Sequence, residues 1–434
     1  MQTQELYKLF IESSGVSTDS RAITPCSIFF ALKGDNFNGN NFALSALEAG
    51  AQYSVVDDKT LPANNNLIQT EDVLTALQDL ARYHRAKLRI PVVGLTGTNG
   101  KTTTKELITT VLSTKYKVIS TQGNLNNHIG VPLTLLKMDS ATQIGVVEMG
   151  ASAPGEIATL VSISQPNYGL ITNVGKAHLL GFGSFEGVKN TKGELYDYLF
   201  KTGGTAIYNI DNPDLCEMIE QRSGIKTAPY GVKHQKYSIL PISSAEPFLR
   251  MKLHSGEMIS TRLIGSYNSD NVMAALAVGK LFHTDLALAI EAIEKYTPSN
   301  NRSQLIKGKE NTLIVDAYNA NPTSMRAALE NFNKMERTKT TLIIGDMLEL
   351  GGESQNEHKA ILNIIKEMRT DNLFFVGGEF ASAAQDDAVL LNKAKFFKTS
   401  LELKEYLLAN PVTGNTFLIK GSRGTRLERV LDVL

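Results

Sequence analysis

The feature that most constrains the fold is a glycine-rich loop that lies between an apolar run and a helical pattern. The run IPVVGLTG begins at Ile90 and predicts a buried strand, and the helical pattern after the loop covers Thr103 to Leu112. A strand, a glycine loop and a helix in this order are typical of a phosphate-binding α/β unit, because the loop N–H groups and the helix N-terminus point at one anion. We therefore expect a parallel sheet with a phosphate site at the carboxyl ends of its strands.

The loop itself reads GLTGTNGKTT over residues 94–103. Its two later glycines permit a tight turn, its lysine is expected to meet the β and γ phosphates of ATP, and the next threonine would offer its hydroxyl to Mg²⁺. Leu95 stands where the standard phosphate loop has glycine, so a glycine-rich turn with a solvated lysine remains an alternative. The ATP-binding residues expected here are Gly97, Thr98, Asn99, Gly100, Lys101, Thr102 and Thr103.

The pattern of apolar runs and helical segments changes twice along the sequence, which predicts three domains. Residues 1–88 alternate short apolar runs with helical patterns, which indicates a small α/β domain. Residues 89–300 hold the glycine loop and further apolar runs spaced by helix-length segments, which predicts a central P-loop-type domain with a parallel sheet. A polar linker, Thr297 to Gln304, leads to residues 301–434, a predicted doubly wound, Rossmann-like domain. The later strands are expected over residues 144–149, 168–174, 205–210, 312–316, 340–344, 372–376 and 416–420.

Charge and composition exclude several classes of function. The chain has 44 basic and 44 acidic residues, so its balance indicates no nucleic-acid partner. Its first residues lack the pattern of a secretory signal, and no apolar run approaches the roughly 20 residues that cross a bilayer. We expect a cytoplasmic monomer without membrane insertion. Cys26 and Cys216 lack metal-site spacing and are interpreted as small buried hydrophobes.

Two further side chains are candidates for metal binding. Glu148 ends the apolar run IGVVEM and should emerge beside the phosphate loop, where a hard cation takes oxygen ligands. A capping or salt-bridged glutamate is the alternative. His178 follows another apolar run, and a lone loop histidine more often forms hydrogen bonds than binds a metal. The residue types alone favour Thr102 and Glu148 as magnesium ligands and leave His178 open.

The segment TGTNGKT after a buried strand resembles the phosphate loop of the Mur ligases and folylpolyglutamate synthases, and the resemblance continues nearly end to end. It implies an ATP-dependent ligase that forms an amide bond. It also implies that His178 binds a second Mg²⁺ and that Lys192, within KNTKGE, carries a carbamate that helps to hold the metal ions. Glu148, His178, Lys192 and Lys101 are then the catalytic residues. Lys189 is expected on a solvated helix face.

The segment GSYNSDN is similar to the G-x-H-N-x-x-N segment of this family, with Tyr267 in place of the commoner histidine. The likeness implies that Asn268 and Asn271 contact adenine, whereas by residue type alone they would be helix caps. Arg302 resembles the arginine that reaches the γ-phosphate from the domain junction. Asp316 resembles its ribose-side or phosphate-side partner.

Three loops resemble the Mur ligases that add D-alanyl-D-alanine. They read DAYNANP from Asp316, GDMLELG over residues 345–351 and KGSRG over residues 420–424, and GNLNNHIG from Gly123 is also similar. An Asn-rich loop supplies neutral donors and acceptors for amide groups, although a plain turn has the same composition. In the N-terminal domain, STDSR resembles the nucleotide-sugar end of the substrate site. The implied substrate-binding residues are Ser20, Arg21, Asn124, Asn126, Asn127, Tyr318, Asn319 and Asn321.

Together these resemblances imply a peptidoglycan-synthesis ligase, with consequences for cell wall biogenesis, cell shape and cell division. It would activate the carboxylate of a UDP-N-acetylmuramoyl tripeptide as an acyl phosphate and couple it to D-alanyl-D-alanine, giving ADP, phosphate and the pentapeptide product. Two alternatives remain open. One is a relative with another acceptor amine, and the other is a P-loop kinase or a nucleotide-regulated binding module.

Overall fold

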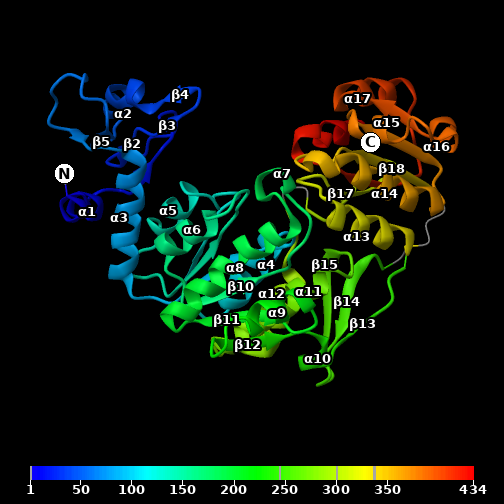
Figure 1. The fold of residues 1–434 in the computed structure, drawn as a ribbon, viewed down its shortest axis with the longest axis horizontal. Coiled ribbons are helices and arrows are strands. Elements are labelled where there is room, and N and C mark those ends of the chain that lie inside the picture. The colour runs from blue at the N-terminus through cyan, green and yellow to red at the C-terminus, as the bar shows by residue number, and fades with distance from the viewer. Residues whose placement is uncertain (1, 244–245, 300–301, 336–338) are drawn as a thin grey trace.

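Three consecutive α/β domains make up the protein (Figure 1). The structure is a computed structural model, and it describes residues 2–243, 246–299, 302–335 and 339–434. The predicted α/β class and the three-domain order are confirmed. The predicted boundaries at 88/89 and 300/301 stay predictions, and residues 300 and 301 of the expected linker lie outside the described residues.

The N-terminal domain is a small parallel sheet flanked by helices. Its elements are α1 (Thr3–Glu12), β1 (Val16–Ser17), β2 (Ile28–Phe30), β3 (Lys33–Gly34), β4 (Phe37–Asn38), η1 (Gly39–Phe42), α2 (Ala43–Glu48), β5 (Tyr53–Val56), β6 (Leu67–Gln69) and α3 (Val73–Leu88). The strand order is β1-β2-β5-β6, with every pairing parallel. The long helix α3 begins where the Asp72 side chain accepts a hydrogen bond from the Thr75 N–H, and it buries one apolar face.

The central domain is built on a six-stranded, fully parallel sheet of order β12-β11-β10-β7-β9-β8. Its elements are β7 (Val92–Thr96), α4 (Lys101–Leu112), β8 (Val118–Ser120), α5 (Gly130–Leu135), β9 (Ile144–Glu148), α6 (Glu156–Ser164), β10 (Tyr168–Ile171), α7 (Leu179–Phe182), α8 (Phe185–Thr202), β11 (Thr205–Asn209), α9 (Pro213–Glu220), β12 (Lys226–Tyr230), α10 (Val232–Gln235), α11 (Asn268–Leu281) and α12 (Leu286–Lys295). Strands β7 and β9 are buried along their whole length, because helices cover both faces of a parallel sheet.

A buried arginine fastens α3 to this domain. The Arg85 Nε donates to the Ser164 carbonyl (2.9 Å), and its Nη2 donates to the Gln165 carbonyl and to Asn167 Oδ1 (both 3.0 Å). Asn167 Oδ1 also accepts from the Val92 N–H (3.0 Å) at the start of β7. These bonds satisfy orphan carbonyls at the end of α6 and join the helix of one domain to the sheet of the next.

An antiparallel subdomain was not predicted from the sequence. It consists of β13 (Ser238–Ile239), β14 (Phe248–Lys252) and β15 (Met258–Ile264), which pair in that order. In β15 buried and exposed residues alternate, so its strand signal is weaker than that of the continuous apolar runs in the main sheet.

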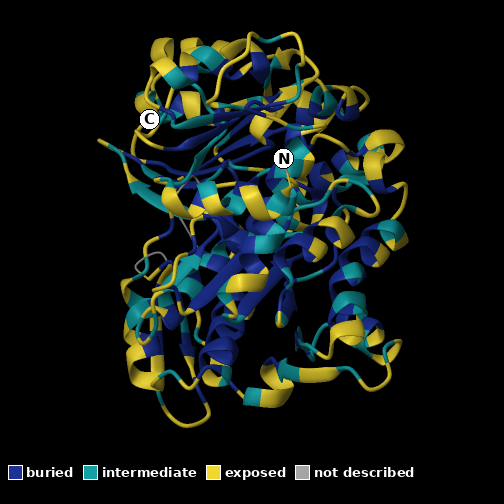
Figure 2. Ribbon diagram, turned by 90° about the vertical axis from the view of Figure 1, so that its left-hand side faces the viewer, coloured by how far each residue is buried: buried dark blue, intermediate teal, exposed yellow. Residues whose placement is uncertain are grey.

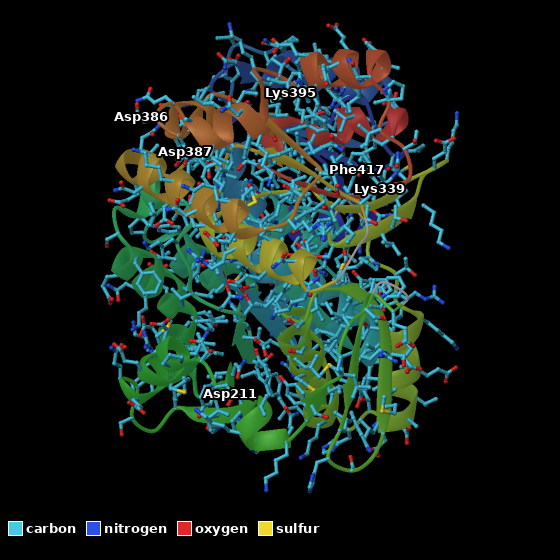
Figure 3. All side chains as sticks on the ribbon, turned by 90° about the vertical axis from the view of Figure 1, so that its right-hand side faces the viewer. Asp211, Lys339, Asp386, Asp387, Lys395 and Phe417 are labelled. Atoms are coloured by element: carbon cyan, nitrogen blue, oxygen red, sulfur yellow. The ribbon has the colours of Figure 1, made fainter. Side chains whose placement is uncertain are left out.

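The C-terminal domain is a doubly wound sheet of order β16-β17-β21-β18-β19-β20, with β16 as its antiparallel edge. Its elements are β16 (Gln304–Lys307), β17 (Thr312–Asp316), α13 (Pro322–Asn333), β18 (Thr340–Gly345), η2 (Gly351–Glu353), α14 (Ser354–Glu367), β19 (Asn372–Val376), α15 (Glu379–Ala383), α16 (Ala388–Lys393), β20 (Lys395–Phe397), α17 (Ser400–Ala409), β21 (Thr416–Lys420), η3 (Arg423–Thr425) and η4 (Leu427–Val433). Buried residues follow both large sheets in Figure 2. Figure 3 places Asp386 and Asp387 at the outer margin of this domain, whereas Phe417 is fully buried.

The cysteine prediction was wrong. Cys26 is exposed and takes a left-handed backbone conformation with φ of 63°, and Cys216 is half-buried, with its thiol donating to the Ile210 carbonyl (3.3 Å). Both are free thiols. Cys26 occupies a turn before β2, where chain geometry rather than side-chain hydrophobicity decides its exposure.

Candidate active site

A cavity of about 840 Å³ lies between the central and C-terminal domains. Its walls come from the segments that follow β7, β9 and β10 in the central sheet and β17 and β21 in the C-terminal sheet. Carboxyl ends of parallel strands are where α/β proteins bind ligands. The cavity lining includes the predicted residues Thr98, Asn99, Gly100, Lys101, Thr102, Thr103, Asn126, Asn127, Glu148, His178, Asn268, Asn271, Arg302, Asp316, Tyr318, Asn319 and Asn321.

The glycines of the phosphate loop are required by close approach. Gly97 has φ of 142°, and a Cβ there would stand 2.0 Å from Thr172 Oγ1. Gly100 has φ of 77°, and a Cβ there would stand 2.7 Å from Asn271 Oδ1. Residues other than glycine rarely adopt either of these backbone conformations. The loop backbone therefore passes directly against β10 and α11 before it enters α4.

Residues after β10 hold the loop in place, and sequence reasoning did not single them out. The Thr172 hydroxyl donates to the Asn99 carbonyl (2.7 Å), while Asn173 accepts from the Asn99 N–H (3.0 Å) and donates to its carbonyl (3.1 Å). The Thr98 N–H also donates to the Asn173 carbonyl (2.9 Å). A Thr-Asn pair at a strand end next to the loop strand is the signal that could have found them.

Lys101 begins α4 and folds back over the loop. Its Nζ donates to the Gly97 carbonyl (2.7 Å) and to the Thr98 carbonyl (3.1 Å). Burial lowers the pKa of Lys101, and the nearby Glu148 carboxylate raises it in part. An anion at the loop would supply the negative charge that this desolvated ammonium lacks.

Glu148 is almost completely buried, with 1% of its surface exposed. Its Oε1 accepts from Asn126 Nδ2 (2.8 Å) and from Thr102 Oγ1 (3.3 Å), and its backbone N–H donates to Thr121 Oγ1 (3.0 Å). Its Oε2 finds no hydrogen-bond partner among the described residues. A buried carboxylate oxygen without a partner is costly, so this oxygen is free for a cation.

Lys192 lies on α8 and is also buried, with 2% exposure. Its Nζ is 3.5 Å from the Ala151 carbonyl and 5.3 Å from the centroid of the Phe182 ring. Burial, assisted by the charge of Lys101, lowers the pKa of Lys192 to about 7. No acidic side chain forms an ion pair with it among the described residues. Its amine is therefore largely neutral just above neutral pH.

Lys189 corrects an expectation. It is buried rather than solvated, and its Nζ pairs with Glu217 (2.5 Å) and lies 3.6 Å from Asp214. The acidic partners on α9 cover it and raise the pKa of Lys189. Lys189 is therefore neutralised by carboxylates, whereas Lys192, on the same helix, lies beside the cavity without an acidic partner among the described residues.

His178 lies in the predicted loop, immediately before α7, in a left-handed conformation with φ of 51°. Its Nδ1 pairs with the carboxylate of Glu349 in the C-terminal domain. Burial lowers the pKa of His178, although Glu349 opposes that shift. The ring also meets Phe182 edge-on, with centroids 6.3 Å apart.

Asn268 and Asn271 share a face of α11 as predicted, but their amides are bonded within the protein. Asn268 Nδ2 donates to the Ile264 carbonyl (2.8 Å), and its Oδ1 accepts from Asn271 Nδ2 (2.8 Å). Asn271 Oδ1 accepts from Thr104 Oγ1 (2.9 Å) on α4. The two residues lock the phosphate-loop helix to α11. Their contact with adenine stays a prediction.

The C-terminal domain contributes stacked and paired groups. The Arg302 guanidinium lies 3.6 Å from the centroid of the Tyr318 ring, a cation–π contact. The buried Lys420 Nζ donates to Asp316 Oδ2, so Asp316 is already neutralised by a lysine that sequence reasoning missed. Tyr267, which stands in place of the expected histidine, bonds through its hydroxyl to Ser303 Oγ (2.9 Å) in the linker.

The predicted Asn residues have unequal surroundings. Asn321 caps α13 by accepting from the Ser324 N–H (2.9 Å), and its Nδ2 donates to Asn99 Oδ1 (2.7 Å) across the domain boundary. Asn127 Oδ1 accepts from the Gly130 N–H (2.9 Å) at the start of α5. Asn124 does not line the cavity, although its carbonyl accepts from the Asn126 N–H (2.8 Å).

Ser20 and Arg21 lie in the N-terminal domain and do not line this cavity. The Arg21 side chain is 88% exposed and forms a salt bridge with Asp19 at 2.7 Å. A second cavity, of about 1040 Å³, lies between the N-terminal and central domains and is lined by Ser17, Thr18 and Asp19 of the same segment. The structure therefore does not bring Ser20 or Arg21 to the phosphate loop.

Two features are absent from the residues that the structure describes. No helix there is long and apolar enough to cross a membrane. No group of three or more His, Cys, Asp or Glu side chains there could enclose a metal ion.

Comparison with known proteins covers the whole chain. Residues 12–85 match the Mur ligase family catalytic domain, residues 95–279 the Mur ligase middle domain, and residues 301–423 the Mur ligase glutamate ligase domain. UDP-N-acetylmuramoyl-tripeptide--D-alanyl-D-alanine ligase of Bacillus subtilis is 36% identical, over 97% of this chain and 93% of the relative. The Escherichia coli protein of the same name is 33% identical, over 99% and 95%.

Solved structures agree with these relatives. MurF from Acinetobacter baumannii aligns with a TM-score of 0.86 and 30% identity, over 99% of this chain and 97% of that one. MurF ligase from Thermotoga maritima, solved in complex with ADP, aligns with a TM-score of 0.84 and 26% identity, over 98% and 97%. With matched domains in the same order and full-length relatives above 30% identity, this chain belongs to the Mur ligase family.

Proposed function

We propose that the chain is the ATP-dependent ligase that joins D-alanyl-D-alanine to a UDP-N-acetylmuramoyl tripeptide, releasing ADP and phosphate. The observation that carries the proposal is the convergence of Lys101, Thr102, Glu148 and His178 on one cavity, with the Lys192 side chain buried beside it. The names of full-length relatives support the choice of substrates. A cytoplasmic monomer is part of the proposal.

The chain's own residues would meet ATP at the phosphate loop. The loop N–H groups and the N-terminus of α4 favour negative charge, and Lys101 adds a full positive charge beside them. A substrate carboxylate must approach the γ-phosphate while both are anionic. Fixed positive charge at that point lowers the barrier to phosphoryl transfer. Arg302 would approach the same phosphate from the linker, held in place by Tyr318.

The site fits magnesium ions. The unpartnered Glu148 Oε2 and the Thr102 hydroxyl provide buried oxygen atoms beside the phosphate loop, and Asn126 holds the carboxylate in that orientation. His178 and Lys192 would hold a second ion. Bound Mg²⁺ supplies charge neutralisation between the phosphate oxygens and the attacking carboxylate.

A carbamate on Lys192 is the modification that fits its surroundings. Only a neutral amine adds CO₂, and the pKa of about 7 keeps a large share of this amine neutral near physiological pH. Addition of CO₂ to the neutral amine releases one proton and leaves a buried anion with two oxygen atoms, which the positive charge of Lys101 would attract. The buried group would then resemble the ligands that Mg²⁺ prefers.

The acyl phosphate formed in this way would react with the amine of the dipeptide. Tyr318 and Asn319 line the C-terminal wall of the cavity, and Asn126 and Asn127 line the central wall. Their amides and hydroxyl provide neutral hydrogen-bonding groups for a peptide acceptor. The nucleotide end of the substrate is proposed to lie at the N-terminal domain, near Ser20 and Arg21. Closure of the two larger domains excludes water that would hydrolyse the intermediate.

One assay tests the proposal. Purified protein, ATP and Mg²⁺ are mixed with the UDP-muramoyl tripeptide and one acceptor, either D-alanyl-D-alanine, single amino acids or glutamate, and phosphate release and product mass are measured. We expect product only with the dipeptide. Product with a single amino acid instead would identify a relative with another acceptor, and equal ATP consumption without any acceptor would reject a ligase.

The carbamate has its own test. Lys192→Ala is expected to lose turnover by roughly 10²–10³-fold, as for removal of a charge-stabilising group, and to recover with added short carboxylic acids. Lys189→Ala on the same helix is the matched control, because its partners are carboxylates outside the cavity. Unimpaired turnover of Lys192→Ala would reject the carbamate.

A further inference from the structure

The Glu349 carboxylate reaches across the domain boundary to His178. Glu349 belongs to the GDMLELG loop after β18, in the C-terminal domain, and its carboxylate pairs with His178 Nδ1 in the central domain. The Leu180 N–H donates to the Glu349 carbonyl (3.4 Å), so the backbone of the same residue also meets α7. Neither the phosphate-transfer steps nor the acceptor site described above uses this residue.

The loop that carries Glu349 is held from three sides. Asp346 accepts from the Glu379 N–H (3.0 Å) and the Phe380 N–H (3.1 Å) at the start of α15. The Met347 N–H donates to His358 Nε2 (3.1 Å), and the Leu348 N–H donates to Ser422 Oγ (3.0 Å). These bonds fix the backbone immediately before Glu349.

Glu349 itself takes a left-handed conformation, with φ of 67°. Non-glycine residues rarely adopt this conformation, and it persists only where the surroundings enforce it. The Glu349 side chain is 59% exposed, and its carboxylate contacts His178 immediately before α7. The loop therefore delivers a carboxylate to one place on the neighbouring domain.

The geometry determines which nitrogen of His178 carries the proton. A carboxylate accepts hydrogen bonds, so in the neutral ring Nδ1 bears the hydrogen and Nε2 keeps a free lone pair. Histidines that bind metal ions commonly donate their other ring N–H to a carboxylate, which fixes the tautomer and the ring orientation. His178 lines the cavity that also holds Glu148 and Lys101.

We infer that Glu349 is a positioning residue for His178, so that a side chain of the C-terminal domain orients the imidazole on the metal-binding side of the site. The central domain supplies the imidazole and the C-terminal domain supplies the carboxylate that orients it. In an open arrangement His178 would lose this partner. The inference rests on the proposed function, in which His178 binds Mg²⁺.

A neighbouring ion pair offers a matched control. Lys176 Nζ and Glu357 Oε1 are 2.7 Å apart, and they join the loop before α7 to helix α14 of the C-terminal domain without an ion pair to the imidazole. Loss of either acidic residue removes one contact across the boundary. Only loss of Glu349 should change the tautomer of His178.

The first measurement uses full-length, metal-free protein with ¹⁵N-labelled histidine, with His178 assigned by comparison with His178→Gln. We expect the wild type and Glu357→Gln to show a protonated Nδ1 and an unprotonated Nε2. Glu349→Ala should show exchange between both tautomers. Glu349→Gln should keep the wild-type tautomer, because its amide oxygen still accepts the Nδ1–H. A wild-type pattern in Glu349→Ala would overturn the inference.

The second measurement is the Mg²⁺ concentration that gives half-maximal ligation. Glu349→Ala should raise it by roughly 10–100-fold, the usual effect of removing a carboxylate behind a metal-binding histidine, with a smaller rise for Glu349→Gln. Glu357→Gln should change it by less than about twofold, as expected for a partly exposed ion pair. Equal rises in Glu349→Ala and Glu357→Gln would reduce Glu349 to a general closure contact and reject its positioning role. If His178→Gln leaves the Mg²⁺ dependence unchanged, the proposed metal site itself fails.

Discussion

The central and C-terminal domains each present the carboxyl edge of a six-stranded sheet to the same cavity, but the two edges carry different chemistry. The central edge carries the desolvated Lys101 and the half-satisfied Glu148, and the desolvated Lys192 lies beside it on α8. At the C-terminal edge Lys420 and Asp316 neutralise each other, and the Arg302 guanidinium lies on the Tyr318 ring. Amides and hydroxyls complete that edge.

This difference indicates that the two edges have separate roles in the proposed reaction. Unbalanced charge is unfavourable in an isolated protein and becomes useful when ATP and cations arrive, so the central edge is suited to phosphoryl transfer. A neutral, hydrogen-bonding edge is suited to the alignment of a peptide amine. Substitutions on the central edge should therefore reduce turnover, while those on the C-terminal edge should mainly affect domain contact and acceptor binding.

The largest effect is expected for Lys101→Ala. Removing the positive charge at the phosphate loop should lower kcat by about 10³-fold, with little change in Tm, since Lys101 bonds only to loop carbonyls. Steady-state phosphate release and thermal unfolding measure the two quantities. Lys115→Ala, beyond the far end of α4, is the control and should retain full turnover. A modest loss for Lys101→Ala would break the proposed contrast between the edges.

Asn126→Ala comes next, because Asn126 holds the Glu148 carboxylate at 2.8 Å. Loss of this support should raise the Mg²⁺ requirement by roughly 10–100-fold. Asn124→Ala, on the same loop but outside the cavity, should leave it unchanged. Titration of ligation rate against Mg²⁺ gives both values. If Asn126→Ala instead raised only the KM for the dipeptide, its role would be in acceptor binding.

The pH dependence of the Lys192 carbamate should be about tenfold. With a lowered pKa of about 7, the amine is neutral above that pH and protonated below it, so carbamate is favoured at high pH and lost at low pH. In protein equilibrated with ¹³C-bicarbonate, an NMR carbamate signal should be present at about pH 8 and fade by about pH 6. The signal should be absent from Lys192→Ala. A midpoint near the ordinary lysine value would contradict the desolvation described here.

A smaller effect is expected on the C-terminal edge. Asn321→Ala loses both the cap of α13 and the bond to Asn99, and should cost about 1 kcal/mol of stability together with a few-fold loss of turnover. Asn321→Ser keeps a capping oxygen but is too short to reach Asn99, so it should regain stability without regaining turnover. Chemical denaturation and initial rates separate the two roles. Equal rates for Asn321→Ser and wild type would remove the inter-domain amide pair from the mechanism.

The smallest effect is predicted for Arg21→Ala. Its exposed salt bridge with Asp19 is screened by solvent, so stability should hardly change, and kcat should be unchanged because Arg21 lies outside the cavity. Any effect should appear in the KM for the UDP-linked substrate alone. A drop in kcat would contradict this prediction, because it would mean that Arg21 of the N-terminal domain affects the reaction at the phosphate loop.

The sequence predicted those parts of the fold whose local signal is strong. Continuous apolar runs located β9 and β17 almost to the residue, because both strands are covered by helices on two faces. The half-exposed strands β14 and β15 were missed for the opposite reason. The local hydrophobic pattern therefore predicts fully buried strands well and half-exposed strands poorly.

Many residues that line the cavity could be predicted from the sequence, but their contacts could not, and Thr172, Asn173 and Lys420 were missed. Sequence order placed Glu148 and His178 at strand ends, yet their partners Asn126 and Glu349 come from other strands or another domain. The cover over Lys189 likewise comes from α9. Such pairs follow from strand order in the sheets and from domain packing, and neither is encoded in a local pattern.

The Arg85 hydrogen bonds between α3 and the central domain determine where the N-terminal domain is attached. Helix α3 has 16 residues and spans about 24 Å, and it runs from the small N-terminal sheet alongside α5 and α6 of the central domain (Figure 1). Under the proposed function, a substrate that binds the N-terminal domain at its nucleotide end would need a peptide long enough to reach the phosphate loop. A peptide one residue shorter would stop roughly 3.5 Å before the phosphate loop. Selection for peptide length would then follow from domain spacing, without a pocket dedicated to any one side chain.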